Sequence, residues 1–76
     1  MTPQEILSTL VRDWMKRQKL SVRAAAKRLG MSEICLSRRL RGDSQWRADE
    51  LLRLRDEGIH VSSELFHALV DEEISA

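Results

Sequence analysis

The chain has 76 residues, 42% hydrophobic and 33% charged, which is enough for one domain with one modest core. Its single cysteine excludes an internal disulfide, and no apolar run reaches the roughly 20 residues needed to cross a bilayer. The N-terminus lacks the basic and apolar segments of a secretory leader. We therefore expect a single domain over residues 1–76, located in the cytoplasm and without a membrane partner.

The net charge of +1 conceals a strong polarity along the chain. From Met1 to Arg47 there are eleven basic residues against four acidic ones, or +7, whereas from Ala48 to Ala76 there are two against eight, or −6. Solvated faces of helical proteins carry charges of both signs, but this segregation predicts one face turned toward phosphates and another turned away.

The first predicted helix begins at the N-terminus. Thr2 can cap it, Pro3 suits its first position, and Glu5 stands where a capping-box carboxylate would lie. Apolar residues then recur at helical spacing to about Gln18 and predict a buried stripe. Its members are Ile6, Leu7, Leu10, Val11 and Trp14.

Two short helix-forming runs follow, Val22 to Leu29 and Glu33 to Leu40, separated by a tight break at residues 30–32. Ser21 and Ser32 are suitable N-caps for the two helices. Gly30 suits a left-handed cap, and Ala26, four residues earlier, is small enough for the closest approach of two steeply crossing helices.

The second of these runs has two different faces. Leu36 and Leu40, four residues apart, predict the side that packs on the core. A short helix with a basic, hydrogen-bonding outer face suits the major groove of DNA. The residues expected on that outer face are Ile34, Ser37, Arg38 and Arg41, with Glu33 at the exposed helix start.

The sequence from residue 42 onward predicts a loop and two more helices. A polar loop at residues 42–47 leads to a helix from about Ala48 to Glu57, which we expect to bury Leu51, Leu54 and also Leu52. A fifth helix is expected from about Ser63 to Ile74, with an apolar stripe wide enough to close the core and also to pair with a second copy. The candidates for this dimer contact are Phe66, Leu69, Val70 and Ile74.

Residues 22–42 resemble the helix-turn-helix of the Cro and CI repressor family, also called the XRE-type family. The resemblance consists of Ala26, Gly30, Leu36 and the basic tail of residues 37–42 that closes with glycine. Many members have glutamine where this chain has Val22, so Arg23 or Ser21 would take over its phosphate contact. The resemblance implies an all-α, compact five-helix repressor-type domain, with the helix-turn-helix as helices two and three, in a small phage-type transcriptional regulator.

On this interpretation the partner is double-stranded DNA, bound in the major groove by a homodimer on a palindromic operator. No catalytic, metal, cofactor or small-molecule site is expected, so we do not predict an enzyme. The expected base contacts are Glu33, Ile34, Ser37 and Arg38. The expected contacts to the DNA backbone are Ser21, Arg23, Ser32, Arg41, Ser44, Gln45 and Arg47.

Two other functions agree with the same sequence. The chain could be the DNA-binding antitoxin of a toxin-antitoxin pair, which changes the partner but not the fold. It could also be a protein-protein interaction module that binds through Phe66, Leu69 and Val70, with the basic half serving only as a solvated surface.

Overall fold

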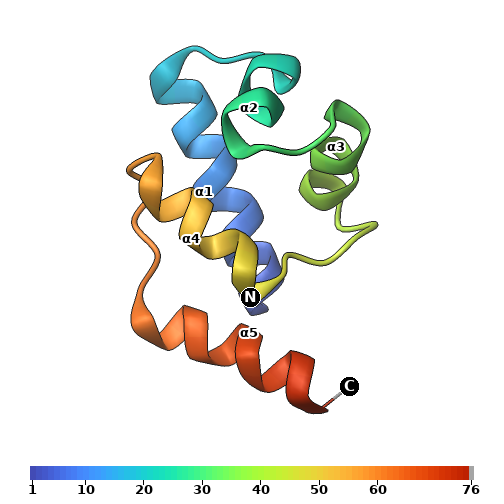
Figure 1. Ribbon diagram of the computed structural model, residues 1–76, viewed down its shortest axis with the longest axis vertical. Helices are drawn as coiled ribbons and strands as arrows, with labels where there is room; N and C mark the ends of the chain where they lie inside the picture. The colour runs from blue at the N-terminus through green and yellow to red at the C-terminus, as the bar shows by residue number, and fades with distance from the viewer. Residues whose placement is uncertain (76) are drawn as a thin grey trace.

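The computed structural model describes residues 1–75, and these form five helices with no strand among them (Figure 1). The predicted all-α class is confirmed, and every predicted helix end agrees to within one residue. The described part of the chain measures 34 × 22 × 22 Å. The helices are α1 (Pro3–Gln18), α2 (Val22–Leu29), α3 (Glu33–Arg41), α4 (Ala48–Asp56) and α5 (Ser63–Ser75).

Side chains just ahead of four helices satisfy their free N–H groups. Ahead of α5 the Ser62 hydroxyl accepts from the Leu65 N–H at 3.1 Å. The Thr2 hydroxyl accepts from the Glu5 N–H at 3.2 Å, and the Glu5 carboxylate accepts from the Thr2 N–H at the same distance. The hydrogen bond from the Thr2 N–H, followed by one from the Thr2 side chain, lowers the pKa of Glu5 below its ordinary value, because both stabilise the ionised carboxylate. Ser21 and Ser32 cap α2 and α3 in the predicted manner, each with a 3.1 Å bond. The starts of these helices are therefore encoded locally.

Gly30 ends α2 in the left-handed region, at φ +71°. The chain then turns directly into α3, with the Met31 N–H donating to the Ala26 carbonyl at 3.0 Å. A Cβ built on Gly30 meets no atom within 4 Å, so backbone conformation alone requires glycine there.

We expect a Gly30→Ala variant to lose about 1–2 kcal/mol of unfolding free energy, the usual cost of a left-handed conformation for a residue with a Cβ. Urea denaturation measures this loss. A Gly30→Asn variant is the control and should lose less, because asparagine tolerates this conformation better. A loss well above this range would show that Gly30 also has a packing role.

The core lies where all five helices meet. Leu7, Leu36, Leu51 and Leu54 are fully buried, and Trp14 is 2% exposed. Two predicted core residues lie outside it: Leu52 is 56% exposed, and Ile6 is 37% exposed. Each follows or precedes a buried leucine, and neighbouring residues on a helix point about 100° apart, so both side chains turn toward solvent.

The arrangement separates the two ends of the molecule (Figure 1). Helix α2 packs on α3, and α1 packs on both α3 and α5, whereas α5 crosses the end of the molecule away from α2. None of the helices in residues 1–75 combines the length and apolar character required to cross a membrane.

Candidate nucleic-acid interface

Helix α3 buries one side and exposes the other, as predicted. Leu36 is 0% and Leu40 9% exposed, so this side is anchored in the core. On the opposite side Ile34 is 73% exposed, Glu33, Arg38 and Arg41 are also exposed, and Ser37 is half-buried. All five predicted outer-face residues are thus partly or fully accessible to a ligand.

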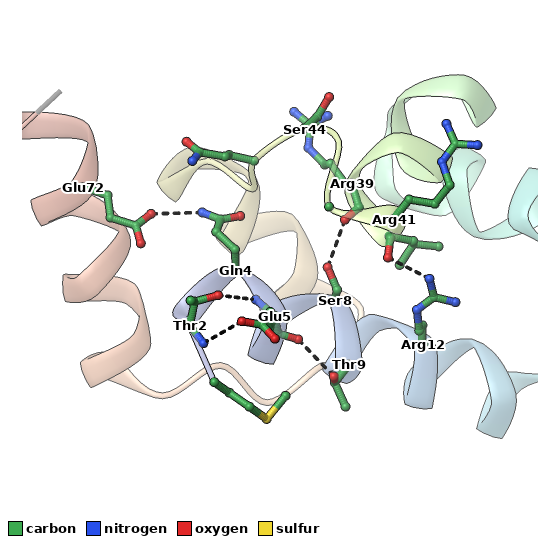
Figure 2. Close-up of a pocket in the computed structure, with 14 residues that line it drawn as sticks. Thr2, Gln4, Glu5, Ser8, Thr9, Arg12, Arg39, Arg41, Ser44 and Glu72 are labelled. Atoms are coloured by element: carbon green, nitrogen blue, oxygen red, sulfur yellow. Dashed lines mark hydrogen bonds between the residues drawn. The ribbon is translucent and has the colours of Figure 1, made fainter.

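The end of α3 is held in place by side chains of α1. Ser8 Oγ donates to the Arg39 carbonyl at 3.0 Å, and Arg12 Nη2 donates to the Leu40 carbonyl at 2.7 Å (Figure 2). These carbonyls belong to the last turn of the helix, which has no partners for them within the helix. The sequence analysis gave neither Ser8 nor Arg12 a role in holding α3. The only available signal was that the two residues are four apart and share one face of α1.

Two neighbouring arginines of α3 have different roles. Arg39 binds Glu50 of α4 through two bonds, Nε to Oε1 at 3.1 Å and Nη2 to Oε2 at 2.7 Å, and only 11% of its side chain is exposed. Its guanidinium also lies 5.9 Å from the centre of the Trp46 ring and donates to Cys35 Sγ at 2.6 Å. Arg38 is exposed and makes no ion pair or side-chain hydrogen bond within residues 1–75. Arg39 is therefore structural, and Arg38 is available to a ligand.

The starts of α2 and α3 both face solvent. Ser21 and Ser32 are exposed although their oxygens already accept backbone hydrogen bonds. Each hydroxyl retains its own hydrogen for donation to a phosphate. Arg23 is exposed in the first turn of α2, and no ion pair joins it to Glu33 in the part of the chain that is described.

The loop of residues 42–47 is fixed from beneath by Trp46. This side chain is 2% exposed, and its indole Nε1 donates to Ser8 Oγ at 3.0 Å. The Trp46 backbone N–H donates to the Gln4 side chain, whose Nε2 in turn donates to the Trp46 carbonyl at 3.0 Å. Trp46 therefore packs under the loop and ties it to α1.

Helix α5 also supports this loop. Gln4 Nε2 donates to Glu72 Oε2 at 3.1 Å (Figure 2). The Ala48 N–H donates to Glu73 Oε1 at 2.9 Å. A groove of about 530 Å³ lies between the start of α1, the end of α3 and this loop. Neither glutamate nor Gln4 was identified from the sequence as a loop support, because each acts on a residue distant in the chain.

The loop residues predicted to contact DNA differ in solvent exposure and in their ion pairs. Gln45 and Arg47 are exposed, and Ser44 is half-buried. Arg41 pairs with Asp43 at 3.2 Å, and Arg47 lies 3.7 Å from Asp49, but all four of these side chains are more than half exposed. Exposed ion pairs of this kind contribute little to stability, so each arginine can readily exchange its carboxylate partner for a phosphate.

The candidate dimer residues on α5 have different environments. Leu69 is 1% exposed and belongs to the core, so it is withdrawn as an interface residue. The prediction failed because the stripe on α5 is wide, and sequence alone does not show which of its members face α1 and α4. Phe66 and Val70 are half-buried, and Ile74 is 78% exposed.

The charge segregation in the sequence is a separation in space for α5 but not for α4, because Glu50 and, just after α4, Glu57 pair with Arg39 of α3 and Arg28 of α2. Helix α5 carries Glu64, Asp71, Glu72 and Glu73 and no lysine or arginine, and it lies at the opposite end of the molecule from α2 (Figure 1). In residues 1–75 no group of three or more His, Cys, Asp or Glu side chains is placed to hold a metal ion.

Comparison of the chain with protein-family models, with curated proteins and with solved structures gives no match.

Proposed function

We propose that this chain is a sequence-specific regulator of transcription that binds double-stranded DNA with α3 in the major groove. The observation that carries this proposal is the outer face of α3, where an unpaired Arg38 lies beside exposed Glu33 and Ile34 on a helix fixed to the core. A rigid helix with exposed polar groups matches the width and the hydrogen-bonding edges of that groove.

The base contacts follow from the chemistry of the exposed side chains. Arg38 can form two hydrogen bonds with guanine, Glu33 can accept from the amino group of cytosine, and Ile34 can contact the methyl group of thymine. Ser37 can serve several bases. Each well-formed contact would contribute about 1–3 kcal/mol of discrimination between bases.

Side chains that can contact phosphates lie on two sides of α3. Ser21, Arg23 and Ser32 lie at the exposed starts of α2 and α3, where free N–H groups and the helix dipole also favour an anion. Arg41 is the last residue of α3, and the loop that follows carries Ser44, Gln45 and Arg47. These groups would position α3 and account for most of the dependence of binding on salt.

One domain of this size reads few base pairs, so we propose that two copies act together. A symmetric pair would present two α3 helices about 34 Å apart on one side of the duplex and would require a palindromic operator. After the withdrawal of Leu69, the side chains left for a symmetric α5 contact are Phe66, Val70 and Ile74.

Selection from random-sequence duplexes tests the proposal. The purified protein should enrich a defined site, and its affinity for that site should fall steeply as salt rises, because bound phosphates release counterions. Weak binding without sequence preference would contradict the proposal and would favour the protein-protein interaction module.

A further inference from the structure

A second groove, of about 510 Å³, lies beside the C-terminal half of α1. Its apolar part is formed by Met15, Leu20, Val22 and Leu40. The first three are half-buried, so they pack on the core without being fully covered. Apolar surface of this kind is stabilised when another apolar side chain covers it.

The edge of this groove is basic. Lys16 and Lys19 line it together with Arg12, against a single acidic side chain, Asp13. Both lysines are exposed and take part in none of the ion pairs formed within residues 1–75. A ligand that suits the groove must therefore combine an apolar side chain with negative charge.

The end of α5 presents this combination. Ile74 is 78% exposed, and Asp71, one helical turn before it, is exposed and lacks an ion-pair partner in the described residues. Glu72 and Glu73 are already held by Gln4 and Ala48 of the same copy. Asp71 and Ile74 therefore provide an acidic and an apolar side chain near this end that make no polar contact and are not part of the core within the described residues.

A copy cannot fill its own groove with its own α5. Glu72 contacts Gln4, near the start of α1, whereas Lys16 lies twelve residues farther along the same helix. At about 1.5 Å per residue this is a separation of about 18 Å. Figure 1 shows α5 at one end of the molecule and the C-terminal end of α1 toward the other.

We propose that copies of this chain associate head to tail, with Asp71 and Ile74 of one copy seated in the groove edged by Lys16 and Lys19 of the next. Electrostatics favour this contact over a symmetric contact between two α5 helices. A symmetric contact would bring two acidic helices together, with no lysine or arginine on either. The head-to-tail contact joins opposite charges.

This contact gives successive copies the same orientation, because the joined surfaces are different. The consequence for DNA depends on the proposed function. Copies joined in this way would read direct repeats, and this arrangement would replace the symmetric α5 contact on a palindrome, because Ile74 cannot serve both contacts. The assembly itself needs no DNA, so it can be tested separately from DNA binding.

Sedimentation velocity of the purified chain should show association that increases with protein concentration in about 0.01 M salt and disappears in about 1 M salt, where charges are screened within about 3 Å. Lys16→Glu and Asp71→Lys variants should each weaken association by about tenfold or more, since each places like charges together. A chain that stays monomeric in low salt would overturn the proposal.

Mixing the two variants identifies the contact. Lys16→Glu retains an intact α5 and Asp71→Lys retains an intact groove, so an equimolar mixture should form a heterodimer that cannot extend. An isotope-labelled Asp71→Lys sample should then show NMR shift changes at Leu20 and Val22 when unlabelled Lys16→Glu is added. No heterodimer, or self-association of Lys16→Glu equal to that of the parent, would rule out this groove.

A Lys27→Glu variant is the matched control, because Lys27 is exposed on α2 and does not line the groove. It should associate like the parent chain. A loss equal to that of Lys16→Glu would show that only net charge matters and would also overturn the proposal. If the assembly is confirmed but no DNA site can be selected, the proposed function fails and the interaction surface remains.

Discussion

An Arg38→Ala variant should lose about 5-fold to 150-fold in affinity for its selected duplex, which corresponds to the 1–3 kcal/mol of one base contact. Its thermal stability should equal that of the parent, because Arg38 is exposed and has no ion-pair partner in residues 1–75. Fluorescence anisotropy on the selected duplex and on single-base variants measures the first effect. The loss should be largest at one base position, where discrimination should also relax.

The neighbouring residue provides the control. An Arg39→Ala variant removes the ion-pair partner of the Glu50 carboxylate and a guanidinium from beside Trp46, so it should lower the unfolding free energy by about 1–3 kcal/mol. Arg55→Ala, at an exposed position on α4, should change neither property. Equal effects of Arg38→Ala and Arg55→Ala on DNA affinity would contradict the placement of α3 in the groove.

A Trp46→Ala variant should lose about 3–5 kcal/mol of unfolding free energy, the usual cost of removing a buried aromatic side chain. Trp46 is 2% exposed and lies beneath the loop of residues 42–47, so its removal opens a cavity between that loop and α1. Urea denaturation followed by circular dichroism measures the loss. The unfolding free energy of a 76-residue domain is small, so part of the Trp46→Ala population should be unfolded at 37 °C.

A Trp46→Phe variant separates packing from hydrogen bonding. It retains an aromatic ring but removes the indole donor to Ser8, whose hydroxyl still donates to the Arg39 carbonyl. The loss should therefore be smaller than for alanine, since a single neutral hydrogen bond contributes about 1 kcal/mol. A Trp46→Ala variant that is as stable as the parent would show that the loop does not depend on this side chain.

The sequence was sufficient for features that depend on neighbours a few residues away. Thr2, Ser21 and Ser32 cap helices in the predicted way, and Gly30 adopts the left-handed conformation that the tight turn requires. The division of α3 into a buried and an exposed face also follows from its spacing alone. These are effects of backbone geometry, which a short segment determines largely by itself.

Features that depend on tertiary contacts were not predictable in this way. Gln4 contacts Trp46 and Glu72, which are 42 and 68 residues away. The sequence alone also gives Arg38 and Arg39 the same chemistry. Only the position of Glu50 on α4 shows that Arg39 forms an ion pair within the fold, whereas Arg38 does not. The exposed Leu52 and buried Leu69 illustrate the same limit for apolar residues.

The two tryptophans also provide optical probes of separate parts of the molecule. The chain has no tyrosine, so its ultraviolet emission comes almost entirely from Trp14 and Trp46. Arg28, at the end of α2, lies 5.6 Å from the Trp14 ring, whereas Trp46 contacts Ser8 and supports the loop after α3. A Trp46→Phe variant therefore emits from the α1–α2 junction alone, and its difference from the parent spectrum reports on the loop. Motion at the α1–α2 contact and at the loop after α3 can be followed separately, without an attached dye.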